Sequence, residues 1–168
     1  MRKSAVVLFI IASLAACASS GSYSPDMPDL LVGKIQLHME NYGDRTGTYT
    51  TGVYATFKGK GTEALYSCAL DSDGFFSSTT LDEGDYIFTG LWIDQLVIPR
   101  TRSFSIPFKS EITIKRGQVN VFGELIVTYN QAGKSRVEAN GNIEDMKALF
   151  ALKAPDSPWL QKSWRSVF

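Results

Sequence analysis

The sequence predicts a mainly β protein, an antiparallel β-sandwich with one or two short C-terminal helices. Three observations lead to this fold class. Apolar and polar residues alternate with a period of two along most of the chain, and clusters of Gly, Asp, Asn and Ser separate the alternating stretches. The period becomes helical only near residue 142. Short strands with turn signals at this spacing are typical of sandwiches and barrels.

Length and composition exclude several classes of protein. The 168 residues allow one domain or at most two, and an apolar share of 44% excludes a disordered or fibrous chain. The 17 basic and 17 acidic residues balance, which gives no electrostatic reason to expect nucleic acid as a partner. Two cysteines are too few for a disulfide scaffold or a zinc cluster.

Residues 1–16 have the form of a signal peptide. Arg2 and Lys3 give a positive start, and Ala5 to Ala12 form an apolar run too short for a permanent membrane span. The next residues, Leu14-Ala15-Ala16-Cys17, resemble the lipobox of bacterial lipoproteins. This resemblance implies that the peptide is cut before Cys17 and that lipid is attached to this cysteine.

The resemblance to the lipobox also implies a cellular location. In that family an Asp directly after the lipidated cysteine favours the inner membrane, whereas this chain has Ala18. We therefore expect a lipid anchor in the outer membrane, with the leaflet left open. Each buried methylene contributes about 0.8 kcal/mol, so two or three acyl chains suffice as an anchor. The alternative is an ordinary secretory signal that leaves Cys17 as a free thiol.

Residues 17–29 are small, polar and interrupted by Pro, so we expect a flexible tether there. The strand domain then covers residues 30–141. Its first strand is expected at Lys34–Glu40, and turn chemistry follows at Asn41–Gly47. Further strands are expected at Val53–Lys58, Ala64–Leu70, Phe75–Thr80, Asp85–Trp92, Ser103–Phe108, Ile112–Ile114, Val119–Tyr129 and Ser135–Ala139. The alternation predicts a core that includes Ile35, Leu37, Val53, Phe57, Phe76, Tyr86 and Phe88.

One stretch resembles a known family. Asp73-Gly74-Phe75-Phe76, followed by Leu81 and by Gly84-Asp85-Tyr86-Ile87-Phe88, is similar to a pattern of transthyretin-like sandwiches. That group includes carboxypeptidase regulatory-like and collagen-adhesin B-type modules. Glu83 stands where the pattern usually has Pro. The resemblance implies a tight turn at Gly74, a core position for Leu81 and a binding, spacing or stabilising module without a catalytic motif.

Residues 142–168 have a different period. Asn142 is a suitable cap for a helix whose apolar residues are Ile143, Met146, Leu149, Phe150 and Leu152, and Pro155 ends it. A second short helix is expected from Asp156 or Ser157 and Pro158, with Leu160 and Trp164 on one face. We expect both helices to cover a sheet edge or an open end of the sandwich. An interaction role for this aromatic tail is the alternative.

Single residues with chemical potential are few. His38, the only histidine, has neither a nucleophile nor an orienting group beside it in sequence, so a solvated or capping role is expected. Cys68 alternates with Tyr66 and Leu70, which predicts a small buried side chain. A reactive or dimer-forming thiol is the alternative. With Cys17 acylated, no internal disulfide can form.

Three charged groups need an interpretation. Acidic turn residues could offer oxygen ligands to calcium, but they lack the spacing of a calcium-binding loop and are expected to be solvated: Asp71, Asp73, Asp82, Glu83 and Asp85. The run Lys58-Gly59-Lys60-Gly61-Thr62 is not a phosphate loop, because Tyr54 stands where that motif needs Gly. A diffuse basic stretch is typical of a solvated face: Arg100, Arg102, Lys109, Lys115 and Arg116.

Two classes of function remain open. The first is a non-catalytic envelope lipoprotein that binds an envelope protein or glycan, with the membrane as its partner through Cys17. The second is a small envelope hydrolase with an unrecognised carboxylate-based site. The absence of a recognisable nucleophile and base favours the first class. We expect no catalytic residue, no cofactor and no metal.

Overall fold

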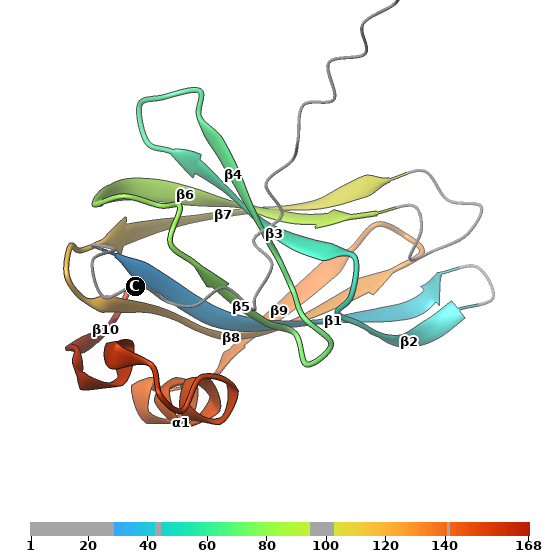
Figure 1. Ribbon diagram of the computed structural model, residues 1–168. Helices are drawn as coiled ribbons and strands as arrows, with labels where there is room; N and C mark the ends of the chain where they lie inside the picture. Colours follow the sequence, from blue (N-terminus) through green and yellow to red (C-terminus); the bar gives the residue numbers. More distant parts are fainter. Residues whose placement is uncertain (1–28, 43–44, 95–102, 141) are drawn as a thin grey trace, which may run out of the picture.

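The protein is described by a computed structural model that covers residues 29–42, 45–94, 103–140 and 142–168. These residues form two β-sheets, one α-helix and a short 3-10 helix (Figure 1), which confirms the prediction of a mainly β fold with a helical C-terminal segment. The signal peptide, Cys17, most of the expected tether, and Arg100 and Arg102 lie outside the described residues.

The larger sheet is built around two long strands, β1 (Leu30–Tyr42) and β8 (Val119–Asn130). They run side by side from the pair Leu30 and Val119 to the pair Glu40 and Asn130. Each is flanked by two shorter strands. On β1 these are β2 (Arg45–Tyr49) and β5 (Phe75–Ser78), and on β8 they are β9 (Ser135–Asn140) and β10 (Trp164–Ser166).

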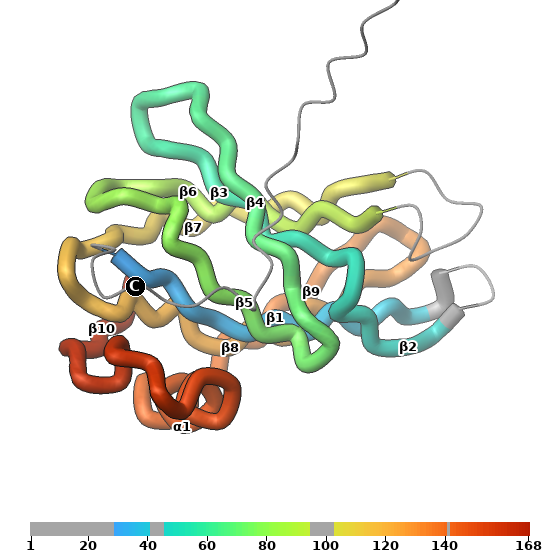
Figure 2. Tube along the Cα trace, in the orientation of Figure 1, coloured from blue at the N-terminus to red at the C-terminus, as the bar shows by residue number. Residues whose placement is uncertain are grey.

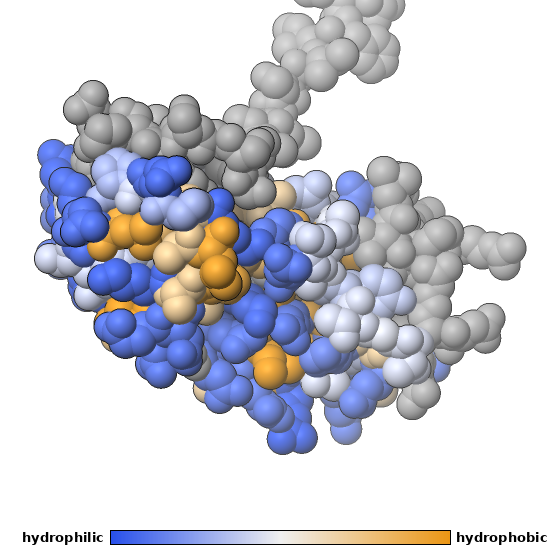
Figure 3. All heavy atoms as spheres, turned by 60° about the horizontal axis from the view of Figure 1, so that its bottom comes forward, coloured by the Kyte–Doolittle hydropathy of each residue, from blue (hydrophilic) through white to orange (hydrophobic). Residues whose placement is uncertain are grey.

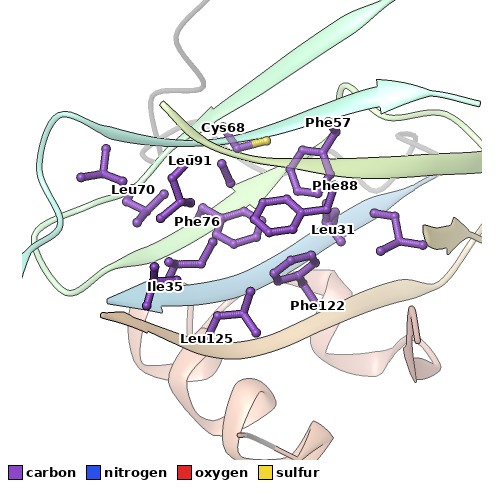
Figure 4. Packing of buried hydrophobic residues seen from close by; sticks show 14 of the residues in the cluster. Leu31, Ile35, Phe57, Cys68, Leu70, Phe76, Phe88, Leu91, Phe122 and Leu125 are labelled. Carbon is purple, nitrogen blue, oxygen red and sulfur yellow. The ribbon is translucent and has the colours of Figure 1, made fainter. Parts of the chain in front are cut away.

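The smaller sheet has the order β4–β3–β6–β7 and is antiparallel throughout. Its strands are β3 (Val53–Gly59), β4 (Leu65–Ala69), β6 (Gly84–Ile93) and β7 (Phe104–Ile114). The two sheets face each other across an apolar core, in which Phe76 and Phe88 point into the space between them and Phe122 approaches from β8 (Figure 4). The predicted core residues are all buried: Ile35, Leu37, Val53, Phe57, Phe76, Tyr86 and Phe88.

The expectation of a purely antiparallel fold is wrong for the larger sheet. β8 runs parallel to both of its long-range neighbours, β1 and β10. The alternation of a strand is the same whichever way its neighbour runs, so the sequence pattern carries no information on direction. Parallel neighbours need a long connection. Here the chain between β1 and β8 supplies the whole smaller sheet.

Three expected segments also differ in the structure. Part of Asn41–Gly47, interpreted as a turn, belongs to β2, which is held by pairing with β1. Ser103–Phe108 and Ile112–Ile114 are joined in the single strand β7. Trp164, expected on a helix, lies in β10, where pairing with β8 outweighs the local helical spacing.

The helical segment forms a third layer on the outer face of the larger sheet, not at its edge or at an open end (Figure 1). Asn142 caps α1 (Ile143–Lys153), because its side chain accepts a hydrogen bond from Asp145 N at 2.8 Å. The 3-10 helix η1 (Pro158–Gln161) follows. Together with the sheet they enclose a second core, formed by Leu30, Val32, Phe75, Val119, Val121, Met146, Phe150 and Trp159.

The last residues join the two sheets. Val167 N donates to Val121 O at 3.0 Å, and Val167 O accepts from Thr113 N of β7 at 3.3 Å. Arg165 also donates to Thr113 O at 2.8 Å. In Figure 2 the red end of the chain therefore lies near the blue start of β1, since β10 and β1 both border β8.

Candidate functional site

The structure gives His38 a hydrogen-bond partner. Its Nδ1 lies 2.7 Å from Thr48 Oγ1, across the pairing of β1 with β2. Both side chains are on the outer face of the larger sheet, away from the core between the sheets. His38 therefore fixes the β2 edge through Thr48.

The acidic turn Asp71–Gly74 is closed by its own backbone and by a lysine. Asp71 Oδ1 accepts from the N–H groups of Asp73 and Phe75, each at 2.9 Å, as in an Asx turn. Lys153 Nζ, at the end of α1, lies 2.7 Å from carboxylate oxygens of both Asp71 and Asp73. This lysine fastens the helix to the turn between β4 and β5.

The lysine shifts the titration of the groups around it. The hydrogen bond and charge of Lys153 hold the pKa of Asp73 below its ordinary value of 3.8. Burial of the ammonium lowers the pKa of Lys153, but the hydrogen bonds that it donates to Asp71 and Asp73, together with their negative charge, raise that pKa above 10.5 overall. The lowered pKa of Asp73 and the raised pKa of Lys153 both favour the ionised forms, and therefore the ion pair between them.

The remaining acidic candidates have other partners. Asp85 Oδ1 accepts from the Thr113 hydroxyl at 2.7 Å, and Glu83 pairs with Arg116 at 3.9 Å. Asp82 accepts the Tyr86 hydroxyl through its backbone oxygen at 3.0 Å. Within the described ranges, no group of three or more His, Cys, Asp or Glu is arranged to hold a metal ion. The structure thus does not bring the five acids together.

Other candidates serve the fold. Cys68 is buried in the core between the sheets, as its alternation predicted. The run Lys58–Thr62 leads from β3 into the turn before β4, with Lys58 paired to Glu63 at 2.9 Å. Lys109, Lys115 and Arg116 are exposed, as expected of a solvated face.

Asp29, expected at the end of the flexible tether, belongs instead to the folded domain and is the one buried carboxyl in the described part of the chain. Burial raises its pKa above the ordinary value of 3.8. Its Oδ1 accepts from Gly117 N at 3.1 Å. Asp29 therefore ties the start of β1 to the turn between β7 and β8.

The smaller sheet presents aromatic side chains to solvent on its outer face. Trp92 of β6 is 43% exposed and pairs directly with Tyr54 of β3. Beyond them the row continues with Ala69 on β4 and Ser105 on β7, which are both small. We call these four residues the aromatic row.

A depression adjoins the row at the end of the two sheets. It measures about 570 Å³ and is lined by Thr48, Tyr49, Thr50, Thr51, Gly52, Tyr54 and Asp94. Tyr54 belongs to both features, and Asp94 N donates to Gly52 O at 2.9 Å beside it. The row and the depression form one continuous surface of aromatic rings, hydroxyl groups and a carboxylate.

Sequence reasoning could not place Trp92 on this surface. With Tyr86 and Phe88 pointing inward, strict alternation also puts Trp92 inside. A bulge at Thr89–Gly90 shifts the register by one residue, so that Leu91 and Ile93 are buried instead. The only signal in the sequence is the isolated glycine within the expected strand.

No family model matches the chain, and no significant match was found among curated proteins or solved structures.

Among the described residues, no helix has the length and apolar character that a membrane span requires. Figure 3 shows the side of the molecule that carries the helical layer, where a small group of apolar residues is surrounded by hydrophilic ones. Leu152 of α1 is 82% exposed.

Proposed function

We propose that the protein is a lipid-anchored envelope lipoprotein whose β domain is a non-catalytic binding module. The observation that carries the proposal is the contrast between two groups of residues. The histidine and acids that chemistry would need are engaged in holding the fold. In contrast, the smaller sheet displays an exposed tryptophan, and next to it lies a depression lined by hydroxyl groups, tyrosine rings and a carboxylate.

The finer fold assignment is a transthyretin-like sandwich. It is supported by Gly74, whose φ of +78° forms the turn before β5, and by Leu81, which is buried after β5. Tyr86 and Phe88 enter the core as the resemblance implied. Two features differ from a purely antiparallel sandwich: the parallel pairing of β8 with β1 and β10, and the helical layer on the larger sheet.

The anchor rests on the sequence Leu14-Ala15-Ala16-Cys17 and the apolar run before it. Acyl chains on Cys17 would hold the module at the outer membrane, with residues 18–28 as a spacer. The module then needs no apolar membrane-binding face of its own.

The experiment compares the wild-type chain with Cys17→Ser after expression with its signal peptide in a Gram-negative host. Wild-type protein should sediment with the outer membrane and enter the detergent phase on Triton X-114 partitioning. Cys17→Ser should be released to the aqueous phase, and Cys68→Ser, the matched control, should partition like the wild type. Equal partitioning of wild type and Cys17→Ser would contradict the lipid anchor.

A further inference from the structure

We propose that the aromatic row and the adjoining depression bind a neutral glycan chain. This inference deepens the proposed function, because it names the ligand class of a binding module. It rests on the course of β6, the spacing of Tyr54 and Trp92, and the chemistry of the depression.

The exposure of Trp92 is built into the backbone of β6. Gly90 has a φ of +140°, and a Cβ at this position would lie 2.1 Å from Ile106 O. Thr56 Oγ1 donates to Gly90 O at 2.9 Å, and Thr89 Oγ1 donates to Thr56 O at 3.1 Å. These contacts fix the bulge that turns Trp92 outward, and bulges that redirect a side chain are common beside functional sites.

The geometry of the row suits a sugar ring. Directly paired residues on neighbouring strands have Cβ atoms about 5 Å apart, so Tyr54 and Trp92 lie side by side as an aromatic strip on the outer face of the sheet. The small side chains of Ala69 and Ser105 leave space at both ends of this strip. A pyranose ring has an apolar face of C–H groups that packs on such an aromatic strip, while its hydroxyl groups stay at the rim.

The depression contains groups that can form hydrogen bonds with the hydroxyl groups of a sugar. Thr48, Thr50 and Thr51 bring hydroxyls that both donate and accept, and Tyr49 and Tyr54 add ring surface. A carboxylate such as that of Asp94 accepts up to four hydrogen bonds and so can bind ligand hydroxyls alongside its other contacts. The negative charge of Asp94 in this lining disfavours an anionic ligand and so favours a neutral one.

A glycan fits this surface better than a folded protein partner does. A stable protein interface needs about 800 Å² on each partner around an apolar centre. Here the directly paired neighbours of the two aromatic residues are Ala69 and Ser105, which are both small, and the exposed Leu65 lies at the far end of β4. An apolar surface that rests on two aromatic side chains suits a sugar ring better than a protein interface.

The test is isothermal titration of the full chain in lauryldimethylamine oxide, a detergent without a sugar headgroup. The probes are cellohexaose, maltohexaose and chitohexaose, with an oligogalacturonate as the anionic comparison. The variants are Trp92→Ala, Tyr54→Ala and Trp92→Phe, and the matched control is Leu152→Ala on the opposite side of the molecule. Circular dichroism establishes that each variant is folded.

We expect at least one neutral hexasaccharide to bind. Its affinity should fall at least tenfold in Trp92→Ala and Tyr54→Ala, less in Trp92→Phe, and less than twofold in Leu152→Ala. The proposal is overturned if no neutral sugar binds, if only the oligogalacturonate binds, or if both alanine variants bind like the wild type.

A photocrosslinking residue at Ser105 separates this inference from the proposed function. If no sugar binds but the residue at position 105 crosslinks in cells to a defined envelope protein, the glycan proposal fails and the binding module stands. If neither sugar binding nor crosslinking is found, both fail.

Discussion

Gly90 sets the course of β6 and hence the position of Trp92. Gly90→Ala would place a methyl group against Ile106 O in a backbone conformation that alanine rarely adopts. We expect a loss of about 2 to 4 kcal/mol in the free energy of unfolding, measured by urea denaturation. Gly61→Ala is the control: its φ is +78°, but nothing lies within 4 Å, so only about 1 kcal/mol should be lost. Equal losses would show that the close approach at Gly90 is unimportant.

Phe88 is the second residue on which stability depends. Its ring lies 5.5 Å from that of Phe57 and 5.0 Å from that of Phe122, so it links the two sheets. Phe88→Ala should cost about 3 to 5 kcal/mol, a large part of the stability of a domain this size. Leu65→Ala, at a position 72% exposed, should change stability by less than about 0.5 kcal/mol in the same denaturation experiment. Similar values for the two variants would contradict the assigned core.

At the scale of elements, Lys153 connects α1 to the turn between β4 and β5. Lys153→Met keeps the apolar stem but removes the ion pairs with Asp71 and Asp73. Since the lysine is only 26% exposed, we expect a loss of about 1 kcal/mol at neutral pH after allowance for solvent screening.

The pH dependence of this loss follows from the pKa of Asp73. Because that pKa is lowered in the folded state, the ion pair stabilises the fold above the ordinary value of 3.8 and loses this effect as the pH falls through the lowered pKa. Thermal melts should therefore show a difference between wild type and Lys153→Met at pH 7 that shrinks below about pH 4. A difference that is constant between pH 7 and pH 2 would exclude an electrostatic origin.

The elements that the sequence predicted best are those with strict alternation. β3 and the second half of β1 bury every other residue, and this pattern is visible without any partner strand. β2 and β10 were missed because their residues, such as Thr46 and Arg165, show no alternation and are held in strands by pairing. Their stability comes from contacts distant in sequence.

One sequence feature other than alternation indicated that the larger sheet is covered on both faces. Leu30, Leu31 and Val32 form an unbroken apolar run, and so do Val121 and Phe122. Such runs indicate strands buried on both faces. In the structure Leu31 and Phe122 enter the core between the sheets, whereas Val32 and Val121 lie under the helices.

At the scale of the whole molecule, the sequence predicted the buried position of Cys68 but neither the hydrogen bond between His38 and Thr48 nor the aromatic row. The alternation of apolar and polar residues around Cys68 predicted its buried position correctly. The row depends on the bulge in β6 and on the pairing of β6 with β3, neither of which has a reliable local signature. A surface whose residues are brought together by strand register can therefore be identified only from the structure.

We predict that the folded chain needs no metal and no disulfide. Asp71 and Asp73 are bonded to Lys153, and Cys68 is buried in the core. Melting temperatures measured with and without EDTA, and with and without a thiol reductant, should agree within about one degree. A melting temperature that falls by several degrees in EDTA would instead indicate that the acidic turns bind a metal ion.

Mass spectrometry of the native N-terminal peptide tests most directly whether the protein is a lipid-anchored lipoprotein. The protein should be extracted from membranes of a Gram-negative host in its processed form. We predict a peptide that begins at Cys17 and carries the mass of a diacylglyceryl group and an amide-linked acyl chain. A native N-terminus at another residue, or an unmodified Cys17, would contradict the account.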